Sequence, residues 1–236
     1  MQIQQLETLL AQNPYPGRGI VVGTSKGGEK AYVAYVLTGR SANSRNRVLK
    51  ARGKDIITAP YDESKVEDPS LIIYAAIRPH GSDLIVTNGD QTDTIYDGLE
   101  RGHSFREALM TREFEPDAPN FTPRISALLH LADAFSFEMS ILKAANEEGS
   151  ACHRYHFEYA SLPGEGRFIH TYEGNGNPLP TFEGEPRRVV LPDTLEALGE
   201  MIWNSLDKEN RISLYVKEIK LATKEEKEVY FNSNLD

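Results

Sequence analysis

Three arginines stand within eight residues of one another in the segment 38–48. Arg40, Arg45 and Arg47 are interleaved there with serine and asparagine. A guanidinium group offers a planar fork of donors that matches phosphate or carboxylate, and the short Ser and Asn side chains add hydrogen bonds without bulk. The segment is therefore a candidate anion-binding site. A solvated turn with incidental charge is the alternative that the spacing alone leaves open.

Two further groups of polar residues accompany apolar runs of the chain. Tyr74 is the only residue with a polar tip in the apolar run 71–77, and its hydroxyl needs a partner if it is buried. A core tyrosine bonded to a backbone carbonyl is the simpler interpretation. Asn88, Gly89 and Asp90 form a turn before a helix. Backbone amides at such a turn can bind an anion, although a plain turn explains these residues equally well.

Cys152, His153 and His156 are residue types that bind zinc, and they lie within five positions of the chain. On a strand, alternation puts Cys152 and His156 on one face and His153 on the other. Because no fuller set of ligands lies nearby in the sequence, we predict no metal site. Cys152 is also the single cysteine of the chain, which excludes an internal disulfide and fits a reducing compartment.

The composition narrows the class of protein. The chain has 236 residues, of which 39% are hydrophobic and 26% charged, as in a globular protein with a substantial core. A formal net charge of −9 argues against a nucleic-acid partner, because a phosphate backbone would be repelled. No apolar run approaches the roughly 20 residues of a membrane span, and residues 1–10 lack the features of a signal peptide. We therefore expect one cytoplasmic domain, residues 1–236, without a membrane partner.

The periodicity of the apolar residues predicts the elements that hold the polar segments. Strands at 18–23 and 31–37 form a hairpin, so that Arg18 at the start of the first strand comes near Arg40 after the second. Strands and helices on both sides of the polar loops indicate an α+β fold with sheets covered by helices. Helices are expected at 2–12, 94–101, 104–111 and 195–206, and further strands at 48–49, 56–58, 71–78, 83–87, 125–131, 135–145, 153–160, 167–172 and 212–221, the last before a charged tail.

Four short motifs together resemble a known family. They are NPYPGRG at 13–19, GRSANSRNR at 39–47, NGDQTDTI at 88–95 and TPRI at 122–125. In this order they resemble the archaeal-type inosine monophosphate (IMP) cyclohydrolases and their bacterial relatives. The resemblance implies that the chain closes 5-formamidoimidazole-4-carboxamide ribonucleotide (FAICAR) to IMP with loss of water, the last step of de novo purine biosynthesis. It also implies that no cofactor takes part.

The same resemblance implies the four-layer αββα sandwich of the N-terminal nucleophile hydrolases. A hydrolase of that kind needs Cys, Ser or Thr at a processed N-terminus, where the free amine acts as the base. Here Met1 is followed by Gln2 and Ile3, and Cys152 lies in the middle of the chain. We therefore expect the fold without the nucleophile, and amidohydrolase chemistry is disfavoured.

The resemblance suggests three catalytic residues. Arg45 resembles the active-site arginine of the family, suited to orienting the amide or stabilising an oxyanion, and Tyr74 resembles its active-site tyrosine, able to donate to the formyl oxygen. Glu115 resembles the active-site glutamate, which would accept the amide proton. Glu113 competes with Glu115 because its spacing to the TPRI motif is loose, and the match of Glu115 to a Glu-x-Asp pattern favours Glu115.

The expected partner is a small-molecule purine ribonucleotide, and the sequence leaves the oligomeric state open, a homo-oligomer included. The glycine- and proline-rich loop 173–188 is expected to cover the site. A noncatalytic purine-nucleotide-binding protein on the same scaffold is the alternative function. The candidates for binding the phosphate and ribose of the substrate are Arg18, Asn43, Ser44, Arg47, Asn88, Gly89, Asp90 and Arg124.

Overall fold

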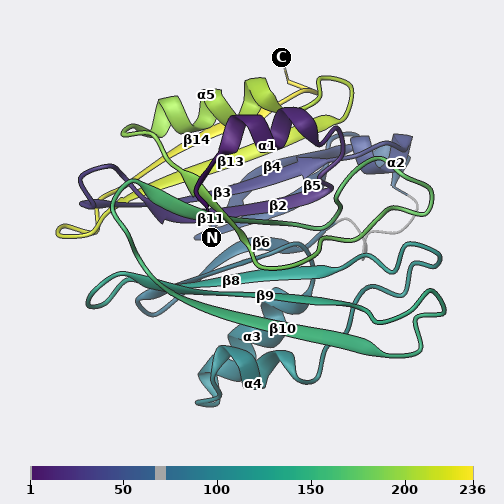
Figure 1. Cartoon of the computed structure of the whole chain (residues 1–236), viewed down its shortest axis with the longest axis horizontal. Coiled ribbons are helices and arrows are strands. Elements are labelled where there is room, and N and C mark those ends of the chain that lie inside the picture. Colours follow the sequence, from purple (N-terminus) through teal and green to yellow (C-terminus); the bar gives the residue numbers. More distant parts are fainter. Residues whose placement is uncertain (1, 67–72, 236) are drawn as a thin grey trace.

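Two seven-stranded sheets dominate the computed structural model, which describes residues 2–66 and 73–235 (Figure 1). The order of strands in the first sheet is β1 (Gln4–Gln5), β12 (Arg187–Val190), β11 (Glu165–His170), β2 (Arg18–Thr24), β3 (Lys30–Thr38), β13 (Arg211–Lys220) and β14 (Glu226–Asn232). The order in the second sheet is β10 (Cys152–Ala160), β9 (Ser136–Ala144), β8 (Arg124–His130), β7 (Asp83–Thr87), β6 (Ala75–His80), β5 (Asp55–Pro60) and β4 (Arg47–Arg52). All pairs except β1 with β12 are antiparallel.

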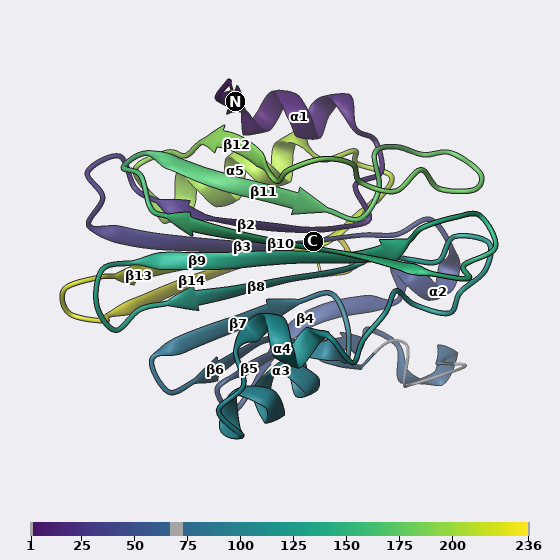
Figure 2. The ribbon, with the colours of Figure 1, turned by 60° about the horizontal axis from the view of Figure 1, so that its bottom comes forward.

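The two sheets pack face to face, and helices cover both outer faces (Figures 1 and 2). Strand β3 is buried on both faces because its alternate residues enter different cores. Tyr35 and Leu37 join the core between the sheets. Val36 packs toward α1 (Leu6–Gln12) and α5 (Leu195–Ser205). On the far side, α3 (Gln91–Glu100) and α4 (Phe105–Leu109) cover the second sheet. The predicted α+β class, with sheets covered by helices, is confirmed.

Helix α5 forms as its sequence predicts. The side chain of Thr194 accepts a hydrogen bond from the backbone N–H of Ala197, which satisfies one donor of the first turn. The spacing of Leu195, Leu198 and Ile202 places these residues on one buried face against the first sheet. This helix therefore anchors the sheet that carries Arg18.

Three predictions about the elements need correction. The first helix begins at Leu6 rather than at residue 2, because Gln4–Gln5 pair with β12. The charged tail after 221 is in part a strand, β14, in which Phe231 packs into the core while charged residues face outward, as on many sheet edges. The predicted strand 71–78 begins at Ala75, and its residues 71–72 lie outside the described part of the chain, as do residues 67–68 of the preceding polar loop.

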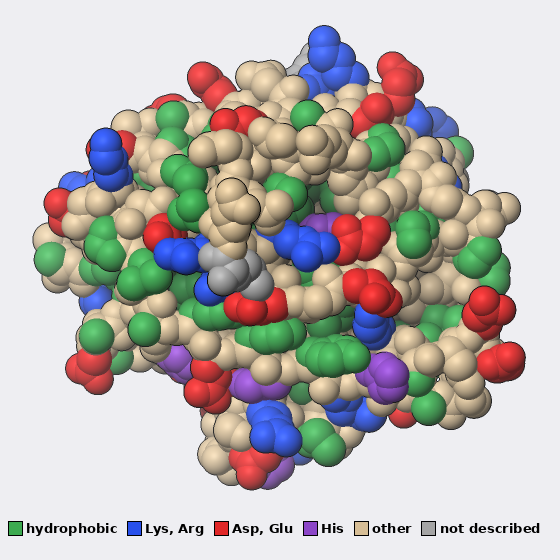
Figure 3. Space-filling model, viewed as in Figure 1, with side chains coloured by type: hydrophobic (Ala, Val, Ile, Leu, Met, Phe, Trp, Pro, Cys, Tyr) green, Lys and Arg blue, Asp and Glu red, His purple; other side chains and the backbone are tan. Residues whose placement is uncertain are grey.

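None of the helices in residues 2–66 and 73–235 has the length and hydropathy needed to cross a bilayer. On the face of the molecule drawn in Figure 3, acidic and basic side chains are intermixed. The arginines described next lie in a cavity whose wall also carries carboxylates.

Candidate functional site

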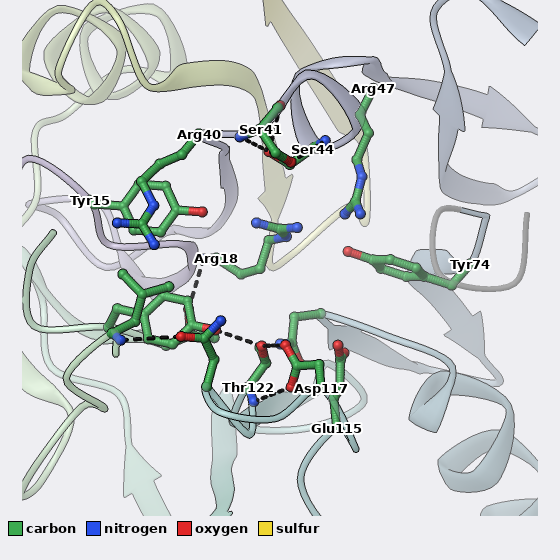
Figure 4. A pocket seen from close by; sticks show the side chains of 15 residues that line it. Tyr15, Arg18, Arg40, Ser41, Ser44, Arg47, Tyr74, Glu115, Asp117 and Thr122 are labelled. Carbon is green, nitrogen blue, oxygen red and sulfur yellow. Dashed lines mark hydrogen bonds between the residues drawn. The ribbon is translucent and has the colours of Figure 1, made fainter. Parts of the chain in front are cut away.

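A cavity of about 330 Å³ opens at one end of the two sheets, near the short helix α2 (Ala42–Arg45) (Figure 4). Its wall is assembled from segments that are distant in the sequence. Antiparallel pairing explains this, because it brings the start of β2, the end of β3 and the end of β11 together. The segments that contribute side chains are 15–18, 40–47, 115–122 and 171–179, together with Tyr74 and Asn88.

Two guanidinium groups face the same space in this cavity, that of the half-buried Arg18 and that of the buried Arg47. Arg18, the first residue of β2, donates from Nη1 to the carbonyl oxygen of Thr38 at 2.7 Å. Arg47, the first residue of β4, is 8% exposed, and its side chain points toward Arg18 (Figure 4). Burial and then the positive charge of Arg18 lower the pKa of Arg47. Two positive charges on the wall of one cavity favour the binding of an anion there.

Tyr74 points its hydroxyl into the cavity beside the two arginines (Figure 4). Its backbone is fixed to β5, since the N–H of Thr58 donates to the Tyr74 carbonyl at 3.0 Å and the Tyr74 N–H donates to Thr58 Oγ1 at 3.3 Å. The Tyr74 hydroxyl lies 2.7 Å from the hydroxyl of Tyr35 in the core between the sheets. Tyr74 is therefore a core tyrosine, as in the simpler interpretation, but its hydroxyl is bonded to a side chain and not to a backbone carbonyl.

Two carboxylates face the arginines from the opposite wall, on the loop before β8 (Figure 4). Burial raises the pKa of Glu115, whose Oε1 lies 3.9 Å from Arg124 Nη1. Asp117 accepts hydrogen bonds from the backbone N–H and the hydroxyl of Thr122. Because the Thr122 hydroxyl donates to Asp117, the Tyr172 hydroxyl, 2.5 Å away, donates to Thr122. The cavity thus has an arginine wall and a carboxylate wall.

Comparison with known proteins identifies the family. The family model described as IMP cyclohydrolase-like protein matches residues 15–225. The chain belongs to this family. The IMP cyclohydrolase of Methanothrix thermoacetophila is 32% identical over 146 residues, which are 58% of this chain and 71% of that protein. The IMP cyclohydrolase of Methanopyrus kandleri is 30% identical over 185 residues, 72% of this chain and 89% of that protein. That of Methanococcus aeolicus is 32% identical over 125 residues, 51% and 61% of the two chains.

Six of the predicted site residues line the cavity of this IMP cyclohydrolase-like chain, and Glu115 rather than Glu113 is among them. Glu113 is 62% exposed in its side chain and pairs instead with Arg154 at 3.5 Å. The hairpin prediction that Arg18 and Arg40 approach each other agrees with the structure, where both belong to the wall. The six are Arg18, Ser44, Arg47, Tyr74, Asn88 and Glu115.

The structure does not bring Arg45 into this group. Arg45 is the last residue of the single turn α2 and is exposed, whereas Arg47, two residues later, begins β4 and is buried. Asn43, on the same turn, is also absent from the wall among the described residues. The family motif therefore contributes Arg40 and Arg47 to the cavity, from either side of α2.

Gly89, Asp90 and Arg124 lie just behind the carboxylate wall. A Cβ atom at Gly89 would be 3.3 Å from Glu115 Oε1 and 2.7 Å from Arg124 Nη1, so this turn packs closely against Glu115. Asp90 accepts from Arg112 and Arg124 at 2.6 Å each. Burial alone would raise the pKa of Asp90, but these two arginines lower it. Gly89 and Asp90 of the predicted turn therefore support the carboxylate wall from behind, while Asn88 faces the cavity.

Several other residues of the wall were not among those that the sequence predicted for the site. Tyr15 stacks on Tyr172 with a centroid distance of 5.9 Å, and the Arg40 guanidinium lies 4.9 Å from the centroid of the Tyr15 ring. Arg40 Nη1 also donates to Asn175 Oδ1 at 2.6 Å, and Leu179 from the same loop reaches the wall. The loop expected to cover the site thus borders the cavity. Only the NPYPGRG motif gave a signal for Tyr15, and nothing local pointed to Tyr172.

A second polar cluster lies on β9 and β10. Glu138, His156 and Glu158 each offer a ligand atom within 4.8 Å of the others, the one such group of three in residues 2–66 and 73–235. The Glu138 carboxylate lies 2.6 Å from His156 Nε2 and 3.1 Å from His130 Nε2. A hydrogen-bonded network already explains the cluster, and Cys152 and His153 are not part of it.

Proposed function

We propose that the protein is an IMP cyclohydrolase, which closes FAICAR to IMP with loss of water. The observation that carries the proposal is a single cavity lined by two arginines, one of them buried, a tyrosine hydroxyl and a carboxylate whose pKa is raised. Relatives at about 30% identity bear that name. The substrate would be a purine ribonucleotide, an anion suited to the arginine wall.

The reaction itself requires little beyond positioning and proton transfer. The carboxamide nitrogen attacks the formyl carbon, and negative charge develops on the formyl oxygen. Both groups stand on neighbouring carbons of the imidazole ring, so the enzyme has to hold a productive rotamer and stabilise the charge. We infer that no cofactor is needed, because each step is a proton transfer or an addition at a carbonyl group.

In the first step, Glu115 accepts a proton from the carboxamide nitrogen as the new C–N bond forms. Tyr74 donates its proton to the formyl oxygen, and Arg47 stabilises the developing charge. In the second step, protonated Glu115 gives its proton to the leaving hydroxyl, and the former formamide nitrogen gives a proton to the Tyr74 phenolate. Burial, which raises the pKa of Glu115, suits a group that both accepts and returns a proton.

Arg47 takes the role that the motif suggested for Arg45. The reason is geometric, since Arg47 is a buried wall residue beside Tyr74 and Arg45 is exposed. We assign the phosphate and ribose to the edge of the cavity with Arg40, Ser41 and Ser44, across from the carboxylate wall (Figure 4).

We further propose that residues 1–236 form one domain of the αββα type found in N-terminal nucleophile hydrolases, whose reaction does not use an N-terminal nucleophile. The order of layers supports this, since two sheets are packed together and helices cover both outer faces. In this proposal the cavity at the sheet ends is the retained cleft of that fold.

The test is turnover of FAICAR by the purified protein after treatment with a chelator, followed by the ultraviolet absorbance of the hypoxanthine ring. We expect product from the wild type and a loss of kcat of at least about 100-fold in Glu115→Gln. Glu113→Gln is the matched control and should keep wild-type kcat, since Glu113 lies outside the wall. Tight binding of IMP without turnover would instead favour the noncatalytic nucleotide-binding protein.

A further inference from the structure

Tyr35 is a buried polar group that the mechanism above does not use. It lies in the middle of β3 with its ring in the core between the sheets, and it is 0% exposed. Within the described residues, the hydrogen bond of its hydroxyl is to Tyr74 at 2.7 Å. Burial raises the pKa of Tyr35 well above its usual value, so this phenol keeps its proton.

The direction of this hydrogen bond follows from the number of protons. Each hydroxyl carries one proton and accepts through its oxygen. If Tyr74 donated to Tyr35, the Tyr35 proton would have no acceptor among the described residues of the core, and Tyr74 would have no proton left to donate into the cavity. If Tyr35 donates to Tyr74, both phenols are satisfied and the Tyr74 proton points into the cavity. The second arrangement avoids the penalty for a buried donor without a partner.

We propose that Tyr35 is a positioning residue for the reaction, which donates a permanent hydrogen bond to the Tyr74 oxygen. The inference rests on the proposed function, because it concerns the step in which Tyr74 donates to the formyl oxygen. In that step the O–H bond of Tyr74 breaks, and an O–H bond forms on the formyl oxygen while the C–N bond forms. The Tyr74 phenolate then receives the Tyr35 hydrogen bond, which is stronger toward a charged oxygen than toward a neutral one.

The structure is arranged to keep this bond in place. Tyr35 belongs to the first sheet, and the backbone of Tyr74 is tied through Thr58 to the second. The hydrogen bond therefore crosses the core between two sheets that packing holds at a fixed separation. Because the bond is stronger in the transition state than in the ground state, it should raise kcat more than it lowers KM.

Tyr35→Phe tests the inference, because it keeps the ring and removes the hydroxyl. We expect kcat to fall about 10- to 100-fold while KM changes less than about threefold. Tyr215→Phe is the matched control, as Tyr215 is fully buried, lies directly opposite Tyr35 on β13 and is not part of the cavity wall. It should keep wild-type kcat.

A double-mutant cycle decides whether Tyr35 acts through Tyr74. If it does, Tyr35→Phe combined with Tyr74→Phe is no slower than Tyr74→Phe alone. If the two substitutions lower kcat by factors that multiply in the double variant, or if Tyr35→Phe has the same kcat as Tyr215→Phe, the inference is overturned and the proposed function stays intact. Absence of turnover in the wild type would overturn both.

Discussion

Removal of one charge from the pair Arg18 and Arg47 should stabilise the free protein and abolish its thermal stabilisation by bound nucleotide. The change is Arg47→Met, which keeps an unbranched side chain of similar length without the charge. Burial and the charge of Arg18 both disfavour the charged form of Arg47 in the folded protein. Burial also opposes the charge of Arg18, but three nearby tyrosines and Glu115 raise the pKa of that group above its usual value. The disfavoured charge is therefore that of Arg47, where stability is given up for binding.

The magnitude follows from the burial of Arg47 and from the position of Arg18 on the same cavity wall. At an effective dielectric constant near 20, two unit charges on neighbouring side chains repel by about 2–4 kcal/mol. Arg47 also makes an interaction with the protein that methionine cannot replace, which offsets part of this gain. We expect a net stabilisation of about 1 kcal/mol, or about 2–4 °C in melting temperature for a chain of this size.

The assay is a thermal melt of wild type and Arg47→Met, each with and without IMP. Binding stabilises by mass action, so IMP at about 100 times its Kd should add about 2.7 kcal/mol to the wild type. The variant should show little shift at the same concentration. Arg45→Met is the control, and because Arg45 is exposed outside the wall it should melt and respond as the wild type does. A lower melting temperature for Arg47→Met together with an undiminished IMP shift would refute the reasoning.

Two further predictions concern stability elsewhere in the fold. Hydrogen bonds with Asp83 and then Glu138 raise the pKa of His130 to about 9, so its stabilising contribution is complete below about pH 6.5 and is lost as the pH rises through 9. As the pH is raised from 6.5 to 9.5, the urea concentration at the unfolding midpoint should decrease in the wild type and decrease less in His130→Gln. The same dependence of the midpoint on pH in both proteins would contradict this. Gly17→Ala should cost more than about 2 kcal/mol, because φ is +72° and the added Cβ would overlap the hydroxyl oxygen of Thr171. Gly53→Ala, with φ +64° and open space around the position, should cost about 1 kcal/mol. Equal losses in chemical denaturation would show that backbone conformation alone decides the effect.

The sequence predicted the parts of the site that depend on local pairing. The two strands of a hairpin pair antiparallel, so the start of β2 lies beside the end of β3. This pairing brings Arg18 to the same end of the hairpin as Arg40. The identity of the buried arginine in the cavity, Arg47, could not be obtained in this way. It depends on the single turn α2, which is too short to give a periodic signal and which leaves Arg45 outside and Arg47 inside.

Local sequence patterns could not predict the contacts between the two sheets. Tyr35 lies in an uninterrupted apolar run, and its partner Tyr74 belongs to the other sheet 39 residues later. Strand β14 was missed for a different reason. Its outward positions carry glutamate and lysine, which protect a sheet edge but read as a solvated tail.

The scattered order of the site residues is a consequence of antiparallel topology. Each strand that runs away from the cavity is followed by one that returns, so the starts of β2, β4 and β6 and the ends of β3, β7 and β11 gather at one end of the sandwich. The side chains that line the cavity stand at these ends or in the loops that follow or precede them, while the strand interiors form the core. The two packed sheets can hold like-charged arginines side by side because the core, and not the cavity, supplies the stability. Substitutions at the strand ends should therefore change binding and turnover at little cost to folding, and those in the strand interiors should do the reverse.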